Sequence, residues 1–329
     1  MLNHWRPSFG KQQHETGTLM SLQAIGNIFI PDSESTLFDH GAFEPRTRRV
    51  FVAHTAKSRL EVIDHDGLCH ITSLGGFPGA AGVVADEGTV LVTNRGSAQL
   101  AVVDAETLRT CAIHPTGPRP NGVAYCPALQ LATVATIGDE SYGPELLAVR
   151  LSDGRRWRLP LPGRPRWCVM DAAGERVFLA IREPAMVLVA RLPQLDEVRH
   201  WPIPSEGPHG LDIDHVSGML YVACDGGALV QCNARDGTIG SLWPLPGGPD
   251  ATFFNAESGL VHIAIGDPGL IQSVNPTTGE NVSVQTAHGA QTTALASPDY
   301  LYVFSPGHHG ALVLKEATAM SDREEAEPR

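Results

Sequence analysis

The sequence lacks any run close to the roughly 18 consecutive apolar residues that a membrane-spanning helix requires. Residues 1–20 contain no apolar stretch of the kind found at the centre of a secretory signal peptide. Charged side chains are also scarce, at 18% of the chain compared with about 25% in average soluble proteins. The first two absences predict a soluble, cytoplasmic protein with no membrane partner.

Positive charge is in short supply as well. The 24 lysine and arginine residues face 36 aspartate and glutamate residues, which gives a formal net charge of −12. A general nucleic-acid binder neutralises phosphates with a basic surface, so no nucleic-acid partner is expected. None of the six cysteines forms a C-x-x-C pair with another, which argues against zinc-ribbon and thioredoxin-type sites.

Glycine and proline, in contrast, are abundant. The chain has 34 glycine and 25 proline residues, together 59 of its 329 residues, compared with roughly 12% in average proteins. Both residue types are common where a chain reverses direction. The sequence therefore indicates many short strands joined by turns.

One pattern of residues recurs along the chain. Its clearest copy spans residues 207–223, where a turn leads into an alternating strand, a polar turn and a second strand. We call the residue at the start of the first strand in each copy the leading residue. The seven leading residues are 40 to 45 positions apart, and they are His40, Ala81, Asn121, Arg166, His209, Asp250 and Gln291. Seven repeated units therefore fill the chain.

Two further strands follow within each unit. Residues 59–64 and 228–233 are examples of the third strand, and residues 69–74 and 241–245 of the fourth. Their apolar residues alternate with a period of two, as in strands, and not with the helical period of about 3.6. Four strands every 40 to 45 residues are typical of a β-propeller blade. We predict an all-β fold, a seven-bladed β-propeller of four-stranded antiparallel blades over residues 21–316.

The seventh unit contains no fourth strand after residues 311–315. Residues 21–30, which precede the first unit, have the length and pattern of a strand. We therefore predict that this N-terminal strand closes the ring as the outermost strand of the last blade. Outside the propeller, the sequence predicts an N-terminal tail at residues 1–20 and a disordered, charged tail at residues 317–329.

Short strand motifs connect these units to a known family. Residues 91–94 (Leu-Val-Thr-Asn) and 220–223 (Leu-Tyr-Val-Ala) belong to second strands, and residues 62–64 and 102–104 end third strands with aspartate. In these motifs the sequence resembles the YVTN-repeat β-propellers, which are related to lactonase, virginiamycin B lyase and NHL-type propellers. The resemblance implies the seven-bladed fold. It implies no single function, because that family includes both enzymes and binding proteins.

The leading residues and the loops after the second strands should surround one end of the central channel, because the first strand of a blade is the innermost. Three histidines in this region, His40, His209 and His288, each precede a glycine. Neutral imidazole is the commonest protein ligand of zinc and similar metals. These histidines are therefore candidate ligands of a divalent metal ion that activates water or polarises a carbonyl group. The alternative is that each histidine only binds a neighbouring backbone group.

The Pro-His-Gly sequence at residues 208–210 resembles the blade openings that carry the zinc ligands of peptidyl-hydroxyglycine lyases. In blade four, Arg166 and Trp167 are candidates for binding a substrate. A guanidinium group that faces the channel can pair with a carboxylate through its planar fork, and an indole ring offers a stacking surface. Pro165 with Arg166 is similar to a Pro-Arg pair of the lactonase propellers. An arginine that binds carbonyl groups of the neighbouring blade is the alternative.

These candidates predict a metal-assisted lyase or hydrolase that acts on a small anionic molecule at the mouth of the channel. The expected catalytic residues are Arg166 and Asp250, and the expected ligands of a zinc or similar ion are the three histidines. The residues expected to bind the substrate are Asn121, Trp167, Gln291 and His54. Two alternatives stay open. One is a non-catalytic propeller that binds a peptide, protein or other ligand on its polar face, and the other is a metal-free lactonase that uses Arg166.

Overall fold

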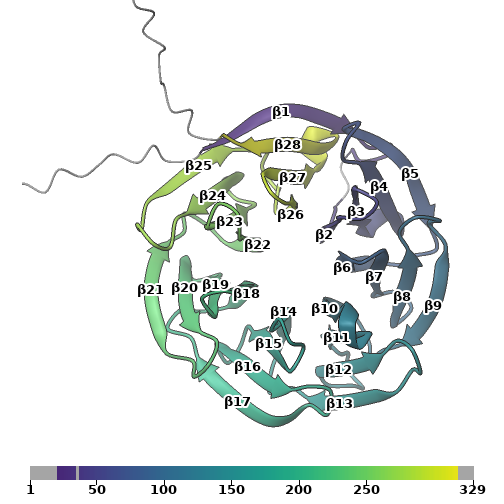
Figure 1. The fold of residues 1–329 in the computed structure, drawn as a ribbon, viewed down its shortest axis with the longest axis vertical. Helices are drawn as coiled ribbons and strands as arrows, with labels where there is room; N and C mark the ends of the chain where they lie inside the picture. The colour runs from purple at the N-terminus through teal and green to yellow at the C-terminus, as the bar shows by residue number, and fades with distance from the viewer. Residues whose placement is uncertain (1–20, 35–36, 318–329) are drawn as a thin grey trace, which may run out of the picture.

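The computed structural model describes residues 21–34 and 37–317, which form seven four-stranded antiparallel sheets arranged in a ring (Figure 1). Each sheet is one blade, and its strands follow one another from the centre of the ring outward. The predicted seven-bladed β-propeller is confirmed. The predicted tails, at residues 1–20 and from residue 318 onward, lie outside the described residues. Within the described ranges, no helix has the length and apolar character needed to cross a membrane.

Blades 1 to 3 each use four consecutive strands. Blade 1 contains β2 (Gly41–Glu44), β3 (Arg49–His54), β4 (Arg59–Asp64) and β5 (Cys69–Gly75). Blade 2 contains β6 (Ala80–Asp86), β7 (Thr89–Asn94), β8 (Gln99–Asp104) and β9 (Thr110–Pro115). Blade 3 contains β10 (Pro120–Cys126), β11 (Leu131–Thr136), β12 (Glu145–Arg150) and β13 (Arg156–Pro160).

The remaining blades continue this order around the ring. Blade 4 contains β14 (Pro165–Met170), β15 (Arg176–Ile181), β16 (Met186–Arg191) and β17 (Asp196–Pro202). Blade 5 contains β18 (Pro208–Asp214), β19 (Met219–Cys224), β20 (Ala228–Asn233) and β21 (Ile239–Pro244). Blade 6 contains β22 (Pro249–Asn255), β23 (Leu260–Ile265), β24 (Leu270–Val274) and β25 (Asn281–Gln285). Blade 7 combines β26 (Thr292–Ala296), β27 (Tyr300–Ser305) and β28 (Gly310–Glu316) with β1 (Leu22–Phe29).

The strands are apolar because neighbouring blades cover both of their faces. In β19, Leu220 and Val222 pack in a core cluster with Phe178 of blade 4. Tyr221, which lies between them in the sequence, packs in a different cluster with Val261 of blade 6. Successive side chains of a strand point to opposite faces, so a strand that is enclosed on both faces has little room for charged residues. This packing explains the low charge content of the chain.

The N-terminal strand β1 closes the ring, as predicted. It pairs antiparallel with β28, from Leu22 opposite Glu316 to Phe29 opposite Gly310. The Glu316 carboxylate accepts hydrogen bonds of 2.8 Å from His262 and 2.6 Å from the Asn255 side chain, both in blade 6. The end of β28 is therefore tied to the preceding blade as well as to β1.

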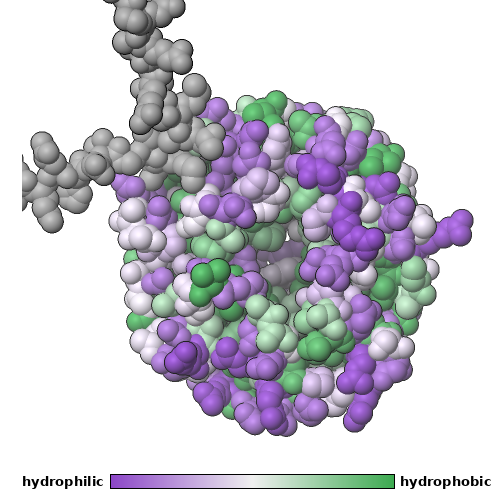
Figure 2. Space-filling view, viewed as in Figure 1, coloured by the Kyte–Doolittle hydropathy of each residue, from purple (hydrophilic) through white to green (hydrophobic). Residues whose placement is uncertain are grey.

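Glycines directly after the leading residues allow the inner strands to approach one another. A Cβ atom at Gly122 would clash with the carbonyl oxygen of Arg166 in the next blade, and one at Gly210 would clash with the carbonyl oxygen of Asp250. Because both positions exclude a side chain, leading residues of adjacent blades come close together at one end of the channel. The hollow at the centre of the ring is visible in Figure 2.

Candidate functional site

A pocket at one end of the channel is lined by six of the seven leading residues, with Ala81 as the exception. We call it the mouth pocket. It encloses about 240 Å³ and lies where the turns into the inner strands meet the loops after the second strands. The sequence candidates that it brings together are His40, Asn121, Arg166, Trp167, His209, Asp250 and Gln291. Residues that are far apart in the sequence therefore share one site.

Two other sequence candidates do not line the mouth pocket. The His54 side chain is completely buried inside blade 1, where its Nδ1 atom lies 2.8 Å from Glu61. The His288 side chain is 78% exposed, and its Nε2 atom lies 3.7 Å from Asp267. His54 is therefore enclosed below the pocket surface and His288 lies on the outer surface of the protein.

The three histidines predicted as metal ligands do not come together as a set. His40 and His209 line the mouth pocket, whereas His288 does not. Across residues 21–34 and 37–317, no group of three His, Cys, Asp or Glu side chains is arranged to hold a metal ion. These residues do not fit the predicted metal centre, and metal binding stays a prediction.

Four arginines line the mouth pocket, and Arg166 alone was a sequence candidate. The others are Arg95, Arg119 and Arg164. The Nε atom of Arg166 is buried and has no hydrogen-bond partner in the described part of the chain. Burial and the positive charge of Arg164 lower the pKa of Arg166, and the charge of Asp250 acts in the opposite direction. A half-buried guanidinium group in this position can donate hydrogen bonds to an anion.

Two stacked rings from different blades line the mouth pocket. His40 of blade 1 and Trp167 of blade 4 have ring centroids 3.8 Å apart and an angle of 7° between their planes. The Nδ1 atom of His40 lies 2.6 Å from Asp39, whose other carboxylate oxygen lies 2.8 Å from Arg95. Burial opposes ionisation of Asp39, but hydrogen bonds from His40 and the charges of His40 and Arg95 hold its pKa well below the usual range. An ionised Asp39 therefore fixes the His40 ring.

His209 lies between two carboxylates at the start of blade 5. Its Nδ1 atom is 2.9 Å from Asp225, and its Nε2 atom is 3.4 Å from Asp250. Burial alone would raise the pKa of Asp225, but the hydrogen bond and charge of His209 and the charges of Arg182 and Arg166 lower it. An ionised carboxylate only accepts hydrogen bonds. Asp225 can therefore accept a hydrogen bond from an N–H group at Nδ1 of His209, while Nε2 lies beside Asp250.

Several residues near the mouth were not among the predicted site residues, although two positions of the repeat contain them. Arg95, Arg182 and Asp225 directly follow the second strands of blades 2, 4 and 5, in the loops that the sequence places at this end of the channel. Arg119 and Arg164 lie two residues before the leading residues of blades 3 and 4. Only the position two residues before the leading residue was overlooked, and an alignment of the units would have identified Arg119 and Arg164 there.

Solved structures of other proteins share this fold. A structure of hydrazine synthase from Kuenenia stuttgartiensis matches with a TM-score of 0.74 and 12% sequence identity, over 88% of this chain and 97% of that chain. A streptogramin B lyase matches with a TM-score of 0.72 and 13% identity, over 91% of this chain and 98% of its own. The WD40 repeats of RRP9 match with a TM-score of 0.75 and 9% identity, over 90% of this chain and 100% of theirs. Identities this low show the fold alone.

The sequence matches no protein-family model and no curated protein. The resemblance to the YVTN-repeat family therefore depends on the strand motifs, while the β-propeller class is shown by the structure and its neighbours. Those neighbours include a lyase and WD40 repeats. The fold is accordingly compatible with both catalytic and non-catalytic roles.

Proposed function

We propose that the protein is a lyase or hydrolase that acts on a small anionic molecule in the mouth pocket. The main support is the Arg166 guanidinium group, which lines the pocket and whose Nε atom has no partner among the described residues. Its positive charge lies close enough to that of Arg164 to lower its own pKa. An anion bound between these groups would offset their repulsion and accept their hydrogen bonds.

The dimensions of the mouth pocket favour a small ligand with a carboxylate or phosphate group. Its volume of about 240 Å³ is below the range of roughly 300 to 1,000 Å³ that is usual for drug-sized ligands. Arginine side chains bind both oxygens of such a group through their planar forks. The stacked rings of His40 and Trp167 offer an apolar surface for the carbon skeleton of the ligand.

His209 is the residue best placed to transfer a proton. Asp225 holds the ring through Nδ1, so that Nε2 is directed to the pocket beside Asp250. A general base must come within hydrogen-bond reach of the proton that it removes, and a ligand held by Arg166 would be bound in the same pocket. Removal of a proton from a ligand carbon would start an elimination, and removal of a proton from water would start a hydrolysis.

The fold is compatible with both forms of the proposal. It is shared by a streptogramin B lyase and by the WD40 repeats of RRP9, so the alternative in which the propeller only binds its ligand stays open. A metal-assisted reaction and a metal-free lactonase reaction through Arg166 are variants of the catalytic form. Elemental analysis of the purified protein separates them, because only the first requires stoichiometric metal and only the first is lost on chelation.

Isothermal titration calorimetry with citrate and with inorganic phosphate tests the binding step. We expect Arg166→Gln to weaken binding of the tighter probe about tenfold, because a hydrogen bond to a charged group contributes roughly 1.5 to 3 kcal/mol. Arg109→Gln removes the same charge from an exposed turn outside the pocket and should leave the affinity unchanged. Equal losses in the two variants, or no binding of either anion by the wild-type protein, would contradict the proposal.

A panel of carboxylate esters, phosphate esters, lactones and hydroxy acids, followed by NMR, tests the catalytic step. With a turned-over compound identified, His209→Gln should lower kcat by about 10² to 10⁴ and leave the affinity for citrate within about twofold. His200→Gln, on the exposed outer strand β17, is the matched control and should be fully active. Anion binding without turnover of any compound would favour the non-catalytic alternative.

A further inference from the structure

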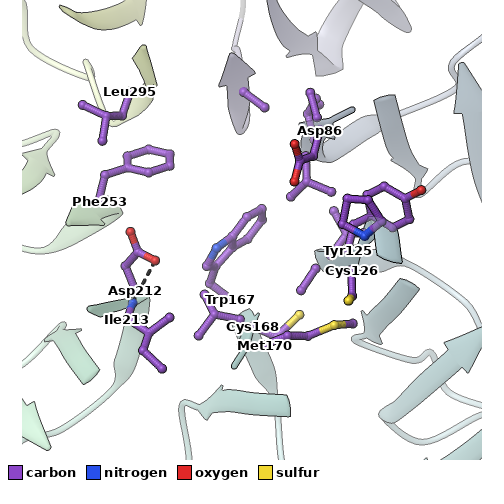
Figure 3. A pocket seen from close by; sticks show the side chains of 18 of the residues that line it. Asp86, Tyr125, Cys126, Trp167, Cys168, Met170, Asp212, Ile213, Phe253 and Leu295 are labelled. Carbon is purple, nitrogen blue, oxygen red and sulfur yellow. Dashed lines mark hydrogen bonds between the residues drawn. The ribbon is translucent and has the colours of Figure 1, made fainter. Parts of the chain in front are cut away.

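A second cavity lies further along the inner strands, toward the turns that follow them. We call it the channel cavity. It has a volume of about 410 Å³ and is lined by residues from the inner strands of all seven blades and by residues of those turns. Figure 3 shows Tyr125, Trp167, Phe253 and Leu295 around it. Trp167 is the one described residue that lines both cavities, and its ring is stacked on that of His40.

Most residues that line the channel cavity are apolar, and several of them are incompletely buried. The side chains of Tyr125, Trp167, Phe253 and Leu295 are all partly exposed although they lie within the ring. Apolar surface that remains in contact with water costs roughly 25 cal/mol per Å² compared with buried surface. An apolar ligand body would cover this surface, and the volume of the cavity is in the usual range for small-molecule sites.

The charge that lines the channel cavity is opposite to that of the mouth pocket. Among the described residues, its lining contains the carboxylates of Asp86, Asp171 and Asp212 but no lysine or arginine. Asp171 already has a cationic partner, because Arg176 donates a hydrogen bond of 2.9 Å to it. Asp86 and Asp212 form no ion pair with another described residue. These two carboxylates lie on different sides of the cavity in Figure 3.

Asp212 is a carboxylate that is hydrogen-bonded but not neutralised. Its two oxygens accept hydrogen bonds of 2.8 Å from the backbone N–H groups of Ile213 and Phe254, and the first of these is dashed in Figure 3. Each oxygen keeps a further lone pair. Burial raises the pKa of Asp212 to about 6, because a charge without a partner is unfavourable in an apolar environment. A cation in the cavity would supply that partner.

We propose that the channel cavity binds a small organic ammonium ion with an aromatic or aliphatic body. The ammonium group pairs with Asp212, while Asp86 adds negative charge from another side of the cavity. The apolar body packs against Trp167, Phe253 and Leu295, and the aromatic faces attract the cation as well. A neutral apolar molecule would leave Asp212 without a partner, and a bare metal ion would leave the apolar walls uncovered. The site does not depend on catalysis at the mouth pocket.

Calorimetric titration with phenethylamine and phenethyl alcohol at neutral pH tests the proposal. The two probes have the same ring and chain and differ in charge, because the amine is protonated at this pH. We expect the ammonium probe to bind about tenfold more tightly than the alcohol, and we expect Asp212→Asn to remove most of this difference. Asp236→Asn removes a carboxylate from an exposed turn of the same blade and should leave the difference intact.

A second variant covers the possibility that Asp212→Asn disturbs the backbone hydrogen bonds around it. Leu295→Trp narrows the cavity and leaves the carboxylates in place, so it should abolish binding of both probes while citrate still binds at the mouth pocket. Thermal melts establish that each variant is folded. Equal affinity for the two probes, unchanged amine binding in a folded Leu295→Trp variant, or no amine binding by the wild-type protein up to about 10 mM would overturn the proposal.

Discussion

Two pairs of a histidine with a carboxylate have nearly the same geometry in this propeller and opposite surroundings. The Nδ1 atom of His54 lies 2.8 Å from Glu61 in blade 1, and the Nδ1 atom of His209 lies 2.9 Å from Asp225 in blade 5. The first pair is completely buried, whereas the side chains of the second are 16% and 24% exposed. Residue types and distances therefore do not separate a structural pair from a candidate catalytic pair, but burial does.

The pair in blade 1 is closed off by its neighbours. Phe38 stacks on the His54 ring with the ring centroids 4.5 Å apart, and it is Phe38 that lines the mouth pocket. The second oxygen of Glu61 lies 2.9 Å from His70 and 2.5 Å from the Ser73 hydroxyl group. Both carboxylate oxygens are thus engaged by side chains of the same blade, and no ligand can reach them.

The pair in blade 5 is open on one side. The second oxygen of Asp225 lies 3.0 Å from Arg182, and the Nε2 atom of His209 faces the mouth pocket beside Asp250. The two pairs therefore differ in access. The pair of blade 1 is enclosed by the fold, and the pair of blade 5 is the one that the proposed proton transfer would use.

Removal of one carboxylate from each pair should separate the two roles. Glu61→Gln leaves buried histidines beside a neutral amide, so the free energy of unfolding should fall by about 3 to 5 kcal/mol. Asp225→Asn affects a partly exposed pair and should cost less than about 1 kcal/mol. Urea denaturation followed by circular dichroism measures both. Equal losses would break the comparison, because burial would then not decide the role of a pair.

The dependence of stability on acidic pH should reflect the enclosed carboxylate of Glu61. Burial opposes ionisation of Glu61, but hydrogen bonds from His54, His70 and Ser73 lower its pKa from 4.5 to about 2. A lowered carboxyl pKa contributes stability that is fully present above the unfolded pKa of 4.5 and is lost as the pH falls toward about 2. The difference in stability between the wild-type protein and Glu61→Gln should therefore shrink over this interval.

Denaturation curves at stepped pH measure this difference, with Glu197→Gln on the exposed strand β17 as the control. The control variant should follow the wild-type protein throughout. A difference between the wild-type protein and Glu61→Gln that stays constant down to about pH 2 would show that the ionised carboxylate adds nothing to stability.

Which leading residues line the mouth pocket follows largely from the period of the repeat. Every blade begins with its innermost strand, so His40, Asn121 and Asp250 occupy equivalent places although they come from different blades, and all three line the pocket. The role of the strand at residues 21–30 was predictable for a related reason. The seventh unit had no outermost strand, and an exposed edge strand is a liability that a closed ring avoids.

The repeat does not predict where a single loop differs in conformation from the equivalent loops of the other blades. The turn that carries His288 is attached to blade 6, because the Gly289 N–H group donates a hydrogen bond of 2.7 Å to the Gly266 carbonyl group, and the histidine stays on the surface. His54 ends its strand at the expected place, but Phe38 comes from a segment before the first unit and covers its ring. Both outcomes depend on contacts between segments that a periodic pattern does not encode.

Arg119 permits the test with the smallest expected effect on stability. It compares a residue of the mouth pocket with the enclosed pair of His54 and Glu61. The φ angle of Arg119 is 53°, in the left-handed region, and the equivalent residues of blades 2 and 5 are Gly79 and Gly207, with φ angles of 61° and 64°. A residue with a side chain in this conformation costs about 1 kcal/mol. The mouth pocket thus carries an arginine where the backbone favours glycine, whereas the enclosed polar residues of blade 1 add to stability.

Arg119→Gly should therefore raise the free energy of unfolding by at most about 1 kcal/mol. The gain from relief of the strained backbone is partly offset, because glycine has greater freedom in the unfolded chain. The affinity of this variant for citrate should fall severalfold, because one of the arginines that line the pocket is lost.

Arg119→Ala is the matched variant, since it removes the charge and keeps the strain. It should lose the same affinity without any gain in stability. A glycine variant that is less stable than the alanine variant would show that this position is not strained, and unchanged citrate binding in both would place Arg119 outside the anion site.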